Sequence, residues 1–162
     1  MKTTLLSCAL FCLSAVVVAE DCPMVPRPKE YRASGDRLVL GTAQTAAIVV
    51  APGASEQELY AAGRLQTHIE RRFKETFPVL TADKLGGSVK QVYEFSGKLM
   101  EDMPFNGFTI AFAKRNDADW ITIRGADMGG LIYGGEAFFD LIKKDADGVA
   151  KVTVAAVKDW PS

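Results

Sequence analysis

The sequence contains few of the residues that bind metals or form disulfides. Its 162 residues include three cysteines and one histidine. Cys8 and Cys12 lie in an apolar N-terminal stretch that we expect to be removed, which leaves Cys22 without a partner in the same chain. No internal disulfide is therefore expected, and an intermolecular bridge through Cys22 is the alternative to an incidental thiol. A Cys/His zinc site is excluded because too few of its ligands remain.

The single histidine does not match the signatures of common hydrolases. In the metalloprotease motif H-E-x-x-H, a glutamate and a second histidine would stand where the chain has Ile69 and Arg72. No G-x-S-x-G sequence is present to supply the serine of a Ser-His-Asp triad. Because the helical pattern places His68 away from the apolar positions, we expect a solvent-facing histidine without a catalytic role.

Neither sign of charge is in excess. The chain has 19 basic and 20 acidic residues and a formal net charge of −1. Nucleic acids and anionic membranes attract proteins with a clear excess of positive charge. The composition therefore predicts neither kind of partner.

The first 19 residues have the pattern of a secretory signal peptide. Lys2 precedes an apolar run over residues 5–18, and Ala19 is a small residue at the expected cleavage point. The run is too short to span a membrane comfortably, and acidic residues follow it at once, which disfavours an uncleaved anchor. We expect an exported protein, secreted or periplasmic, with no membrane contact after cleavage.

The remaining chain has the length of one domain. Residues 20–36 contain three prolines among charged residues and predict an extended entry segment. Residues 37–157 are predicted to form the domain, and residues 158–162 to begin a linker. The expected strands cover residues 37–40, 46–50, 78–80, 89–95, 107–112, 120–124 and 152–154.

Two helices are predicted. Ser55 and Glu58 have the spacing of a capping box, so the first helix begins there and ends before Pro78. Its predicted buried stripe consists of Leu59, Ala62, Leu65, Ile69 and Phe73. The second helix is predicted to bury Leu131, Gly135, Phe138 and Ile142, with Lys143 and Lys144 in its last turn.

A β-hairpin is predicted between the two helices. Apolar and polar residues alternate over 107–112 and again over 120–124, and the short polar link 116–119 joins the two segments. Residues 89–95 also alternate, which predicts a half-exposed strand. Residues 96–107 are expected to form a loop.

The glycine-rich stretch 125–135 lies between a predicted strand and a predicted helix, where nucleotide-binding proteins hold phosphate. Its glycines do not have the G-x-G-x-x-G spacing, and no G-x-x-x-x-G-K-[ST] motif exists. Asp127 is a candidate N-cap that would occupy the amide donors an anion needs. We therefore expect no cofactor, and expect the helical glycines to let the helix lie close to the sheet. They are Gly129, Gly130, Gly134 and Gly135.

Acidic pairs are present but do not predict an active site. Acid–base catalysis needs a carboxyl group in a cleft that raises its pKa. The pairs lie on a predicted helix surface or in turns, where exposure to solvent is expected. They are Glu136 with Asp140, Glu101 with Asp102, and Asp117 with Asp119. No catalytic residue is predicted.

Several aromatic residues could stack on sugar rings. They are Tyr31, Tyr93, Phe105, Trp120, Tyr133 and Trp160. Most of them fall at predicted core or hairpin positions, whereas Trp160 is expected to be exposed. An independent carbohydrate-binding or interaction module is therefore an alternative function.

The order of motifs resembles the N-terminal domain that precedes the catalytic barrel of β-N-acetylhexosaminidases, the family-20 glycoside hydrolases, and related domains of some other glycosidase families. The matching segments are 26–30, 48–53, 61–65, 77–79, 120–127, 130–134 and 157–161. The resemblance covers nearly the whole chain after residue 19, and the poorest match is over residues 89–103.

This resemblance implies an α+β domain with a mixed, mainly antiparallel sheet and two helices packed on one face. In that family an Asp-x-Pro sequence, here Asp159-Trp-Pro161, leads into a (β/α)8 barrel whose Asp-Glu pair cleaves terminal N-acetylhexosamine. A barrel needs about 250 residues, and the sequence ends one residue after Pro161. No catalytic residue of the family can therefore be assigned to this chain.

The expected function is that of a non-catalytic accessory domain of an exported hexosaminidase-like glycoside hydrolase, as a fragment or a stand-alone copy. The barrel is the expected partner, and glycans are the partner in the alternative function. No activity is expected from this chain alone.

Overall fold

The computed structural model describes residues 21–97, 100 and 102–161. The predicted signal peptide lies outside the described residues, as does Glu101. The strands are β1 (Glu30–Val39), β2 (Ala46–Val50), β3 (Val79–Thr81), β4 (Gln91–Ser96), β5 (Phe108–Arg115), β6 (Ala118–Gly125), β7 (Ile142–Lys144) and β8 (Ala150–Asp159). The helices are α1 (Glu56–Phe73), the short 3₁₀ helix η1 (Ala82–Lys84) and α2 (Met128–Phe139).

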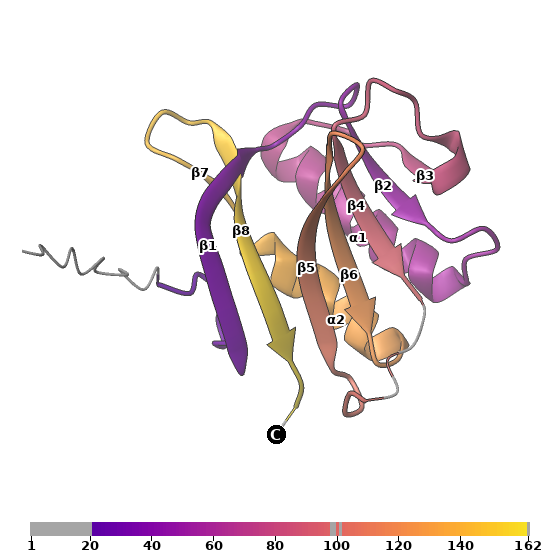
Figure 1. Ribbon diagram of the computed structural model, residues 1–162, viewed down its shortest axis with the longest axis vertical. Coiled ribbons are helices and arrows are strands. Elements are labelled where there is room, and N and C mark those ends of the chain that lie inside the picture. Colours follow the sequence, from indigo (N-terminus) through magenta and orange to yellow (C-terminus); the bar gives the residue numbers. More distant parts are fainter. Residues whose placement is uncertain (1–20, 98–99, 101, 162) are drawn as a thin grey trace, which may run out of the picture.

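All eight strands belong to one sheet, shown in Figure 1. The order across it is β1-β8-β5-β6-β4-β2-β3, and β7 pairs with β8 off this path. Strands β6, β4, β2 and β3 are parallel, and the remaining pairs are antiparallel. The predicted α+β fold with a mixed, mainly antiparallel sheet is confirmed.

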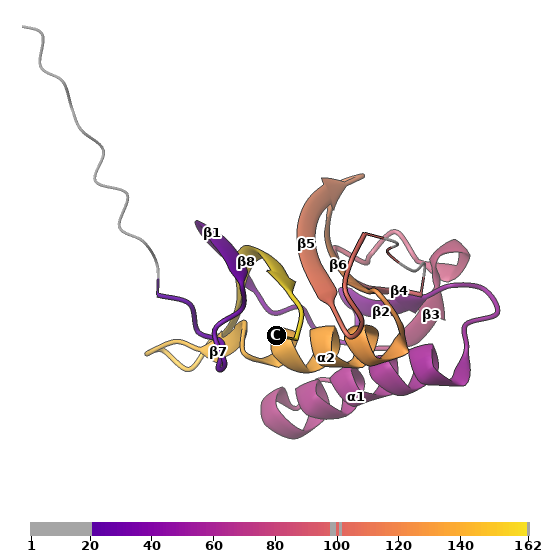
Figure 2. The same cartoon turned by 90° about the horizontal axis from the view of Figure 1, so that it is seen from below.

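Both long helices cover the same face of the sheet (Figure 2). Helix α1 begins with the predicted capping box: the Glu58 amide donates to the Ser55 hydroxyl at 3.2 Å, and the Ser55 amide donates to the Glu58 carboxylate at 2.8 Å. The helix ends at Phe73, because Lys74 has a left-handed backbone with φ of 65°. The helix therefore ends before Pro78 and does not need the proline to stop it.

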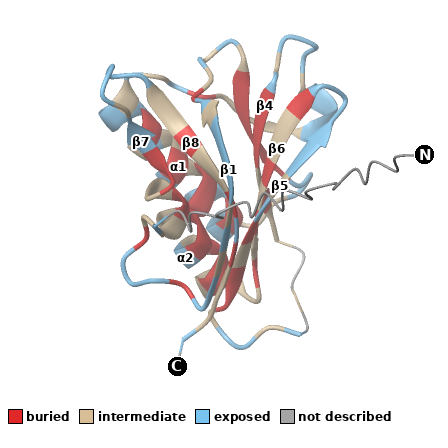
Figure 3. Cartoon of the chain, turned by 60° about the vertical axis from the view of Figure 1, so that its left-hand side comes forward, coloured by how far each residue is buried: buried red, intermediate tan, exposed pale blue. Residues whose placement is uncertain are grey.

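The hydrophobic core fills the space between these helices and the sheet, where buried residues concentrate in Figure 3. Ala62, Leu65 and Ile69 are buried, as the helical spacing predicts. The prediction for Leu59 is wrong, since its side chain is 48 % exposed while that of Ala61 is buried. Helix α1 packs against α2 as well as the sheet, so its buried face is rotated toward α2.

The predicted hairpin is formed by β5 and β6. Its strands pair antiparallel from Phe108 with Gly125 to Arg115 with Ala118. The two turn residues, Asn116 and Asp117, have φ values of 47° and 61°. Positive φ at both positions is the geometry of the type I′ turn, whose twist matches that of paired strands.

The end of α2 differs from the prediction. The helix stops at Phe139, and residues 142–144 form β7, which pairs with β8. The assignment of Ile142, Lys143 and Lys144 to the helix is therefore wrong. As a strand, this segment gains backbone hydrogen bonds to β8, buries Ile142 and leaves both lysines exposed.

Several strands are longer or more buried than the local pattern suggests, and the largest differences are in β1, β8 and β4. β1 begins at Glu30, within the expected entry segment, because residues 30–33 pair with β8. β8 extends over Ala150–Asp159 instead of residues 152–154 alone. β4 is buried on both faces rather than half-exposed, since it lies between β6 and β2, with Val92 1 % and Tyr93 0 % exposed.

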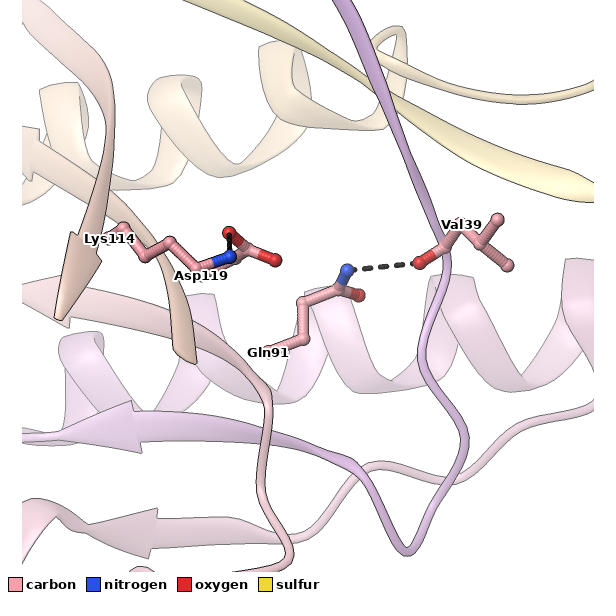
Figure 4. A network of polar contacts seen from close by, with 4 residues as sticks. All are labelled: Val39, Gln91, Lys114 and Asp119. Carbon is pink, nitrogen blue, oxygen red and sulfur yellow. Dashed lines mark hydrogen bonds and ion pairs between the residues drawn. The ribbon is translucent and has the colours of Figure 1, made fainter. Parts of the chain in front are cut away.

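Strands β5 and β8 pair only at residues 108–110 of β5. The chain leaving β1 instead makes contact with β4 through the buried side chain of Gln91 (Figure 4). Its amide Nε2 donates to the Val39 carbonyl at 3.0 Å, and its Oε1 accepts from the Gly41 amide at 2.9 Å. The Tyr93 hydroxyl also donates to Oε1. This network links an edge strand to the centre of the sheet.

Candidate functional site

Helices α1 and α2 contribute walls to two concave surfaces of the described chain. Along α1, five residues at spacings of three and four point away from the core: Tyr60, Gly63, Arg64, Thr67 and Arg71. They form one wall of a groove of about 690 Å³, here called groove 1. The other lining residues are Gln66, His68, Arg72 and Phe139. None of the described residues lining groove 1 is acidic, so the groove is cationic.

An ion pair between the two helices borders groove 1. Arg64 Nη2 lies 2.6 Å from Glu136 Oε1, and Arg64 Nε donates to the same oxygen at 2.7 Å. The hydrogen bond and the charge of Glu136 raise the pKa of Arg64 above its usual value. Both side chains are more than a third exposed, so this pair contributes little to stability. Its structural effect is to join α1 to α2 at the surface.

Glu136 also lines a second groove, groove 2, of about 460 Å³. One wall is the α2 surface, including Tyr133, which is 53 % exposed, and Asp140. The opposite wall consists of residues 24–29 and 159–161. The two grooves therefore lie on either side of the Arg64–Glu136 pair.

Trp160 is half-buried in the wall of groove 2, not fully exposed as its position suggests. The ammonium groups of Lys29 and Lys158 lie 5.0 Å and 5.5 Å from the centre of its ring. Such cation–π contacts hold the indole in place. They also compete with any ligand that would stack on the same ring.

The prediction that His68 faces solvent is wrong. Its ring stacks on Phe139 with 3.9 Å between centroids, and its Nε2 is buried without a hydrogen-bond partner. Burial lowers the pKa of His68, and the positive charge of Arg72 lowers it further, while Glu136 and Asp140 oppose the shift. The imidazole ring therefore packs between α1 and α2.

Of the predicted acidic pairs, Glu136 and Asp140 line groove 2, which Asp159 also lines. Glu136 is ion-paired, and Asp119 lies 3.4 Å from Lys114 across the hairpin. Asp117 is exposed in the turn, and Asp102 is exposed in the loop. Over the described ranges, no group of three or more His, Cys, Asp or Glu residues could hold a metal ion.

The aromatic residues are mostly part of the fold. Tyr93 is fully buried, and Trp120 lies on β6 beneath the guanidinium of Arg115 at 4.6 Å. Tyr31 packs against the core from β1. Phe105, Tyr60 and Tyr133 are 76 %, 55 % and 53 % exposed, so these three aromatic side chains are open to a ligand.

The glycines at the start of α2 serve packing, as predicted. A Cβ on Gly130 would lie 2.1 Å from the Gly107 carbonyl oxygen, and one on Gly134 would lie 2.9 Å from Ile123 Cγ2. Asp127 caps the helix, accepting from the Gly130 amide at 2.8 Å and from the Asn106 amide at 2.7 Å. The donors that a phosphate would need are thus partly occupied by this side chain.

Gly63 is different from these glycines. A Cβ on it would meet no atom within 4 Å. A glycine inside a helix costs about 1 kcal/mol relative to alanine. The fold of the described chain offers no packing reason for this cost, and Gly63 lies in the wall of groove 1.

Sequence reasoning did not identify groove 1, the Arg64–Glu136 pair or Gln91. The first two depend on the placement of α1 beside α2, and the third depends on where the chain crosses after β1. The spacing of Tyr60, Gly63 and Thr67 was the one local signal for groove 1. Within the described ranges, neither helix is long and apolar enough to cross a membrane.

Comparison with known proteins gives matches only among solved structures. No family model matches the sequence, and no curated protein matches it. A GH20 exo β-N-acetylglucosaminidase from Vibrio harveyi matches with a TM-score of 0.59 and 16 % identity, over 86 % of this chain and 19 % of that chain. Flavobacterium johnsoniae chitobiase matches with a TM-score of 0.60 and 17 % identity, over 86 % and 21 %.

A Streptomyces plicatus β-hexosaminidase matches with a TM-score of 0.60 and 15 % identity, over 86 % of this chain and 26 % of that chain. The chain therefore spans about a fifth to a quarter of the length of these structures. At such identities the likeness concerns the fold. The protein has an α+β fold like that of the β-hexosaminidase N-terminal domain, as the sequence resemblance implied.

Proposed function

We propose that this protein is a non-catalytic accessory domain of an exported β-N-acetylhexosaminidase-like glycoside hydrolase, and that it supports a catalytic (β/α)8 barrel. The observation that carries the proposal is the coverage of the structural matches. Nearly the whole chain aligns with GH20 enzymes, but it accounts for a small part of each of them. The same fold in those proteins is thus attached to much more polypeptide.

The surface chemistry supports an accessory role. Its carboxylates are spread over helix surfaces and turns, and those of Glu136 and Asp119 are paired with basic side chains. Glycoside hydrolysis generally needs two carboxyl groups facing each other across a bound sugar. In groove 2, Glu136 is held in an ion pair with Arg64, which disfavours its use as one of two such groups.

Turnover of a chromogenic N-acetylglucosaminide tests the proposal. The purified chain is expected to release no chromophore above the buffer rate, whereas the complete polypeptide that its gene encodes is expected to hydrolyse the substrate. Clear turnover by residues 20–162 alone would refute the accessory role. A coding sequence that continues past codon 162 without a barrel would refute the link to a hydrolase.

The proposed export has a separate test. Mature protein from its native host is expected to begin at Glu20, after cleavage behind Ala19. Amino-terminal sequencing of the protein recovered outside the cytoplasm gives this residue directly. An intact Met1 in a protein that stays in the cytoplasm would contradict it.

Glycan binding is the second candidate function, and groove 2 is the observation that favours it. Tyr133 is half-exposed in the groove that Asp140 also lines, so the groove offers a ring to stack on a sugar and a carboxylate to accept hydrogen bonds from its hydroxyl groups. Titration with chitin and hyaluronan oligosaccharides, followed by the fluorescence of Trp160 in the groove wall, tests this function. Unchanged fluorescence of the protein at millimolar oligosaccharide would count against it, with Trp160→Phe as the control that assigns the signal.

A further inference from the structure

We infer that the face of the sheet opposite the helices binds a carboxylate-bearing sugar of an acidic glycan, and that Arg124 of β6 is the residue that holds the carboxylate. This face is distinct from grooves 1 and 2, whose walls include α1 and α2. The inference concerns this chain alone and does not depend on an attached barrel.

The polar residues of this face come from the centre of the sheet. Strand β6 lies between β5 and β4, and both long helices cover the other side of the sheet (Figure 2). Ile121 and Ile123 of β6, like Tyr93 and Phe95 of β4, belong to the hydrophobic core. Successive side chains of a strand point to opposite faces. The half-buried residues that alternate with these core residues therefore lie on the helix-free face, and they are Glu94, Ser96, Thr122 and Arg124.

Arg124 has a guanidinium group without a partner. Its Nε is buried and has no hydrogen-bond partner among the described residues, and no ion pair within them includes Arg124. The register pairs Glu94 with Thr122 and Ser96 with Arg124, so Glu94 is a diagonal neighbour of Arg124. The Glu94 carboxylate instead accepts from the Thr122 hydroxyl at 2.9 Å and lies 3.6 Å from Arg115 Nη1. A buried donor without a partner is costly and rare in folded proteins, so this one calls for an acceptor from outside the chain.

The two neighbouring charges define the chemistry of that ligand. A guanidinium binds a carboxylate through two parallel hydrogen bonds, which Arg124 is free to make. The carboxylate of Glu94, held in place by Thr122 and Arg115, accepts hydrogen bonds from hydroxyl groups. A sugar acid carries a carboxylate and hydroxyl groups on one ring, so a single unit of an acidic glycan satisfies both residues. An acidic peptide would bring carboxylates without these hydroxyl groups, and Glu94 would repel it.

The neighbouring strand β5 leaves the approach to Arg124 open. On the helix-free face, Thr109 pairs with Arg124 and Ala111 pairs with Thr122. Both side chains of β5 are short, and that of Ala111 is exposed. Figure 2 also shows that the β5–β6 hairpin bends away from the helices, so this side of the sheet is covered by neither long helix.

Amide NMR spectra of the purified chain, titrated with hyaluronan or chitin hexasaccharides, test the inference. The two sugars share N-acetylglucosamine, but only hyaluronan carries carboxylates. Hyaluronan is expected to shift the amide signals of residues 94, 122 and 124 with a Kd below about 1 mM, and chitin to bind at least about tenfold more weakly. Shifts confined to α2 and residues 159–161 would assign the sugar to groove 2 and overturn the inference. Equally tight binding of a polyglutamate peptide to β4 and β6 would assign the face to an acidic protein and also overturn it.

Two substitutions of Arg124 and a matched control test its role. Arg124→Gln is expected to weaken hyaluronan binding at least about tenfold, because a hydrogen-bonded charge pair is lost. Arg124→Lys is expected to bind with intermediate affinity, since an ammonium group keeps the charge but not the planar fork. Arg71→Gln removes the same charge from the exposed surface of α1 and is expected to change the affinity by less than about twofold, because distant exposed charges are screened. Equal losses in Arg124→Gln and Arg71→Gln would show attraction by net charge alone and refute the site.

Thermal unfolding separates binding from a structural role of Arg124. Because its guanidinium has no partner in the described chain, Arg124→Gln is expected to shift the thermal midpoint by less than about 2 °C. A larger fall would show that the fold itself requires Arg124 and would overturn the inference. If the native chain binds no hyaluronan, the inference fails while the accessory role stands, because that role is tested by turnover of the N-acetylglucosaminide.

Discussion

Replacement of Gln91 by leucine removes the hydrogen bonds that tie the end of β1 to β4. Gln91 is 5 % exposed, and its side chain bonds the Val39 carbonyl, the Gly41 amide and the Tyr93 hydroxyl. Leucine has a similar size but no polar atoms, so these three groups lose their partner. A buried polar group without a partner costs about 1–3 kcal/mol.

The three groups differ in their access to water. Tyr93 is fully buried, so its hydroxyl bears the whole cost, and Gly41 is partly buried and bears part of it. Val39 is 60 % exposed, so water can replace the lost amide at its carbonyl. We therefore expect Gln91→Leu to lower the free energy of unfolding by about 2–4 kcal/mol.

Urea denaturation followed by far-ultraviolet circular dichroism measures this loss. Adding Tyr93→Phe to Gln91→Leu removes the hydroxyl that the first change leaves unpaired. The losses of unfolding free energy caused by the two single substitutions should therefore not add. The double variant should be about 1 kcal/mol more stable than the sum of the two losses predicts. A loss below about 0.5 kcal/mol for Gln91→Leu, or strict additivity with Tyr93→Phe, would refute the view that this network holds β1 in place.

Three further changes test the local structure. Gly130→Ala should lower the free energy of unfolding by about 1–3 kcal/mol, because its Cβ would lie 2.1 Å from the Gly107 oxygen. The thermal midpoints of Gly130→Ala and of the control Gly63→Ala, whose Cβ would meet no atom within 4 Å, check this. Equal shifts of the two midpoints would contradict it. Ser55→Ala should cost about 1 kcal/mol through loss of the α1 cap, measured by urea denaturation; an unchanged midpoint would show the cap to be dispensable. His68 has a lowered pKa when folded, so the unfolded chain binds more protons and stability should fall as pH drops below about 6.5. The stability difference between the native chain and His68→Gln should shrink over that range, and a difference independent of pH would argue against a lowered pKa of His68 in the folded chain.

Glycine illustrates how one residue type can have opposite roles on the two sides of a helix layer. Gly130 and Gly134 lie where α2 touches the sheet, so any side chain there would collide with atoms of the chain itself. Gly63 faces outward on α1, where the chain leaves open space. Sequence alone gives these positions the same residue type, and only the distances around each of them show which glycines the packing of the chain requires.

Short-range features were predictable because their causes lie within a few residues. The Ser55–Glu58 capping box needs only the spacing of two side chains, and the hairpin at Asn116–Asp117 needs only two residues that tolerate positive φ. The N-cap at Asp127 belongs to the same class. In each case the backbone groups to be satisfied and the side chain that satisfies them are neighbours in the sequence.

The errors have a common physical cause, since each depends on a neighbour distant in sequence. Ile142 satisfies a helical spacing, but the backbone of β8 offers hydrogen bonds that a longer α2 could not use. His68 lies off the apolar stripe of α1, yet Phe139 of α2 covers it. Leu59 fits the stripe, yet the folded chain leaves its side chain 48 % exposed.

The sequence by itself determined the secondary structure of the central elements, the α+β class and the close packing of α2, because capping, turn geometry and the size of glycine act locally. Tertiary structure alone decided the order of the strands, the Gln91 network and the two grooves beside Arg64 and Glu136. The bonds of Gln91 to Gly41 and Val39 and the Arg64–Glu136 pair, for example, join residues between 50 and 72 positions apart in the chain. No local pattern encodes such contacts, since they exist only after the helices and strands have packed together.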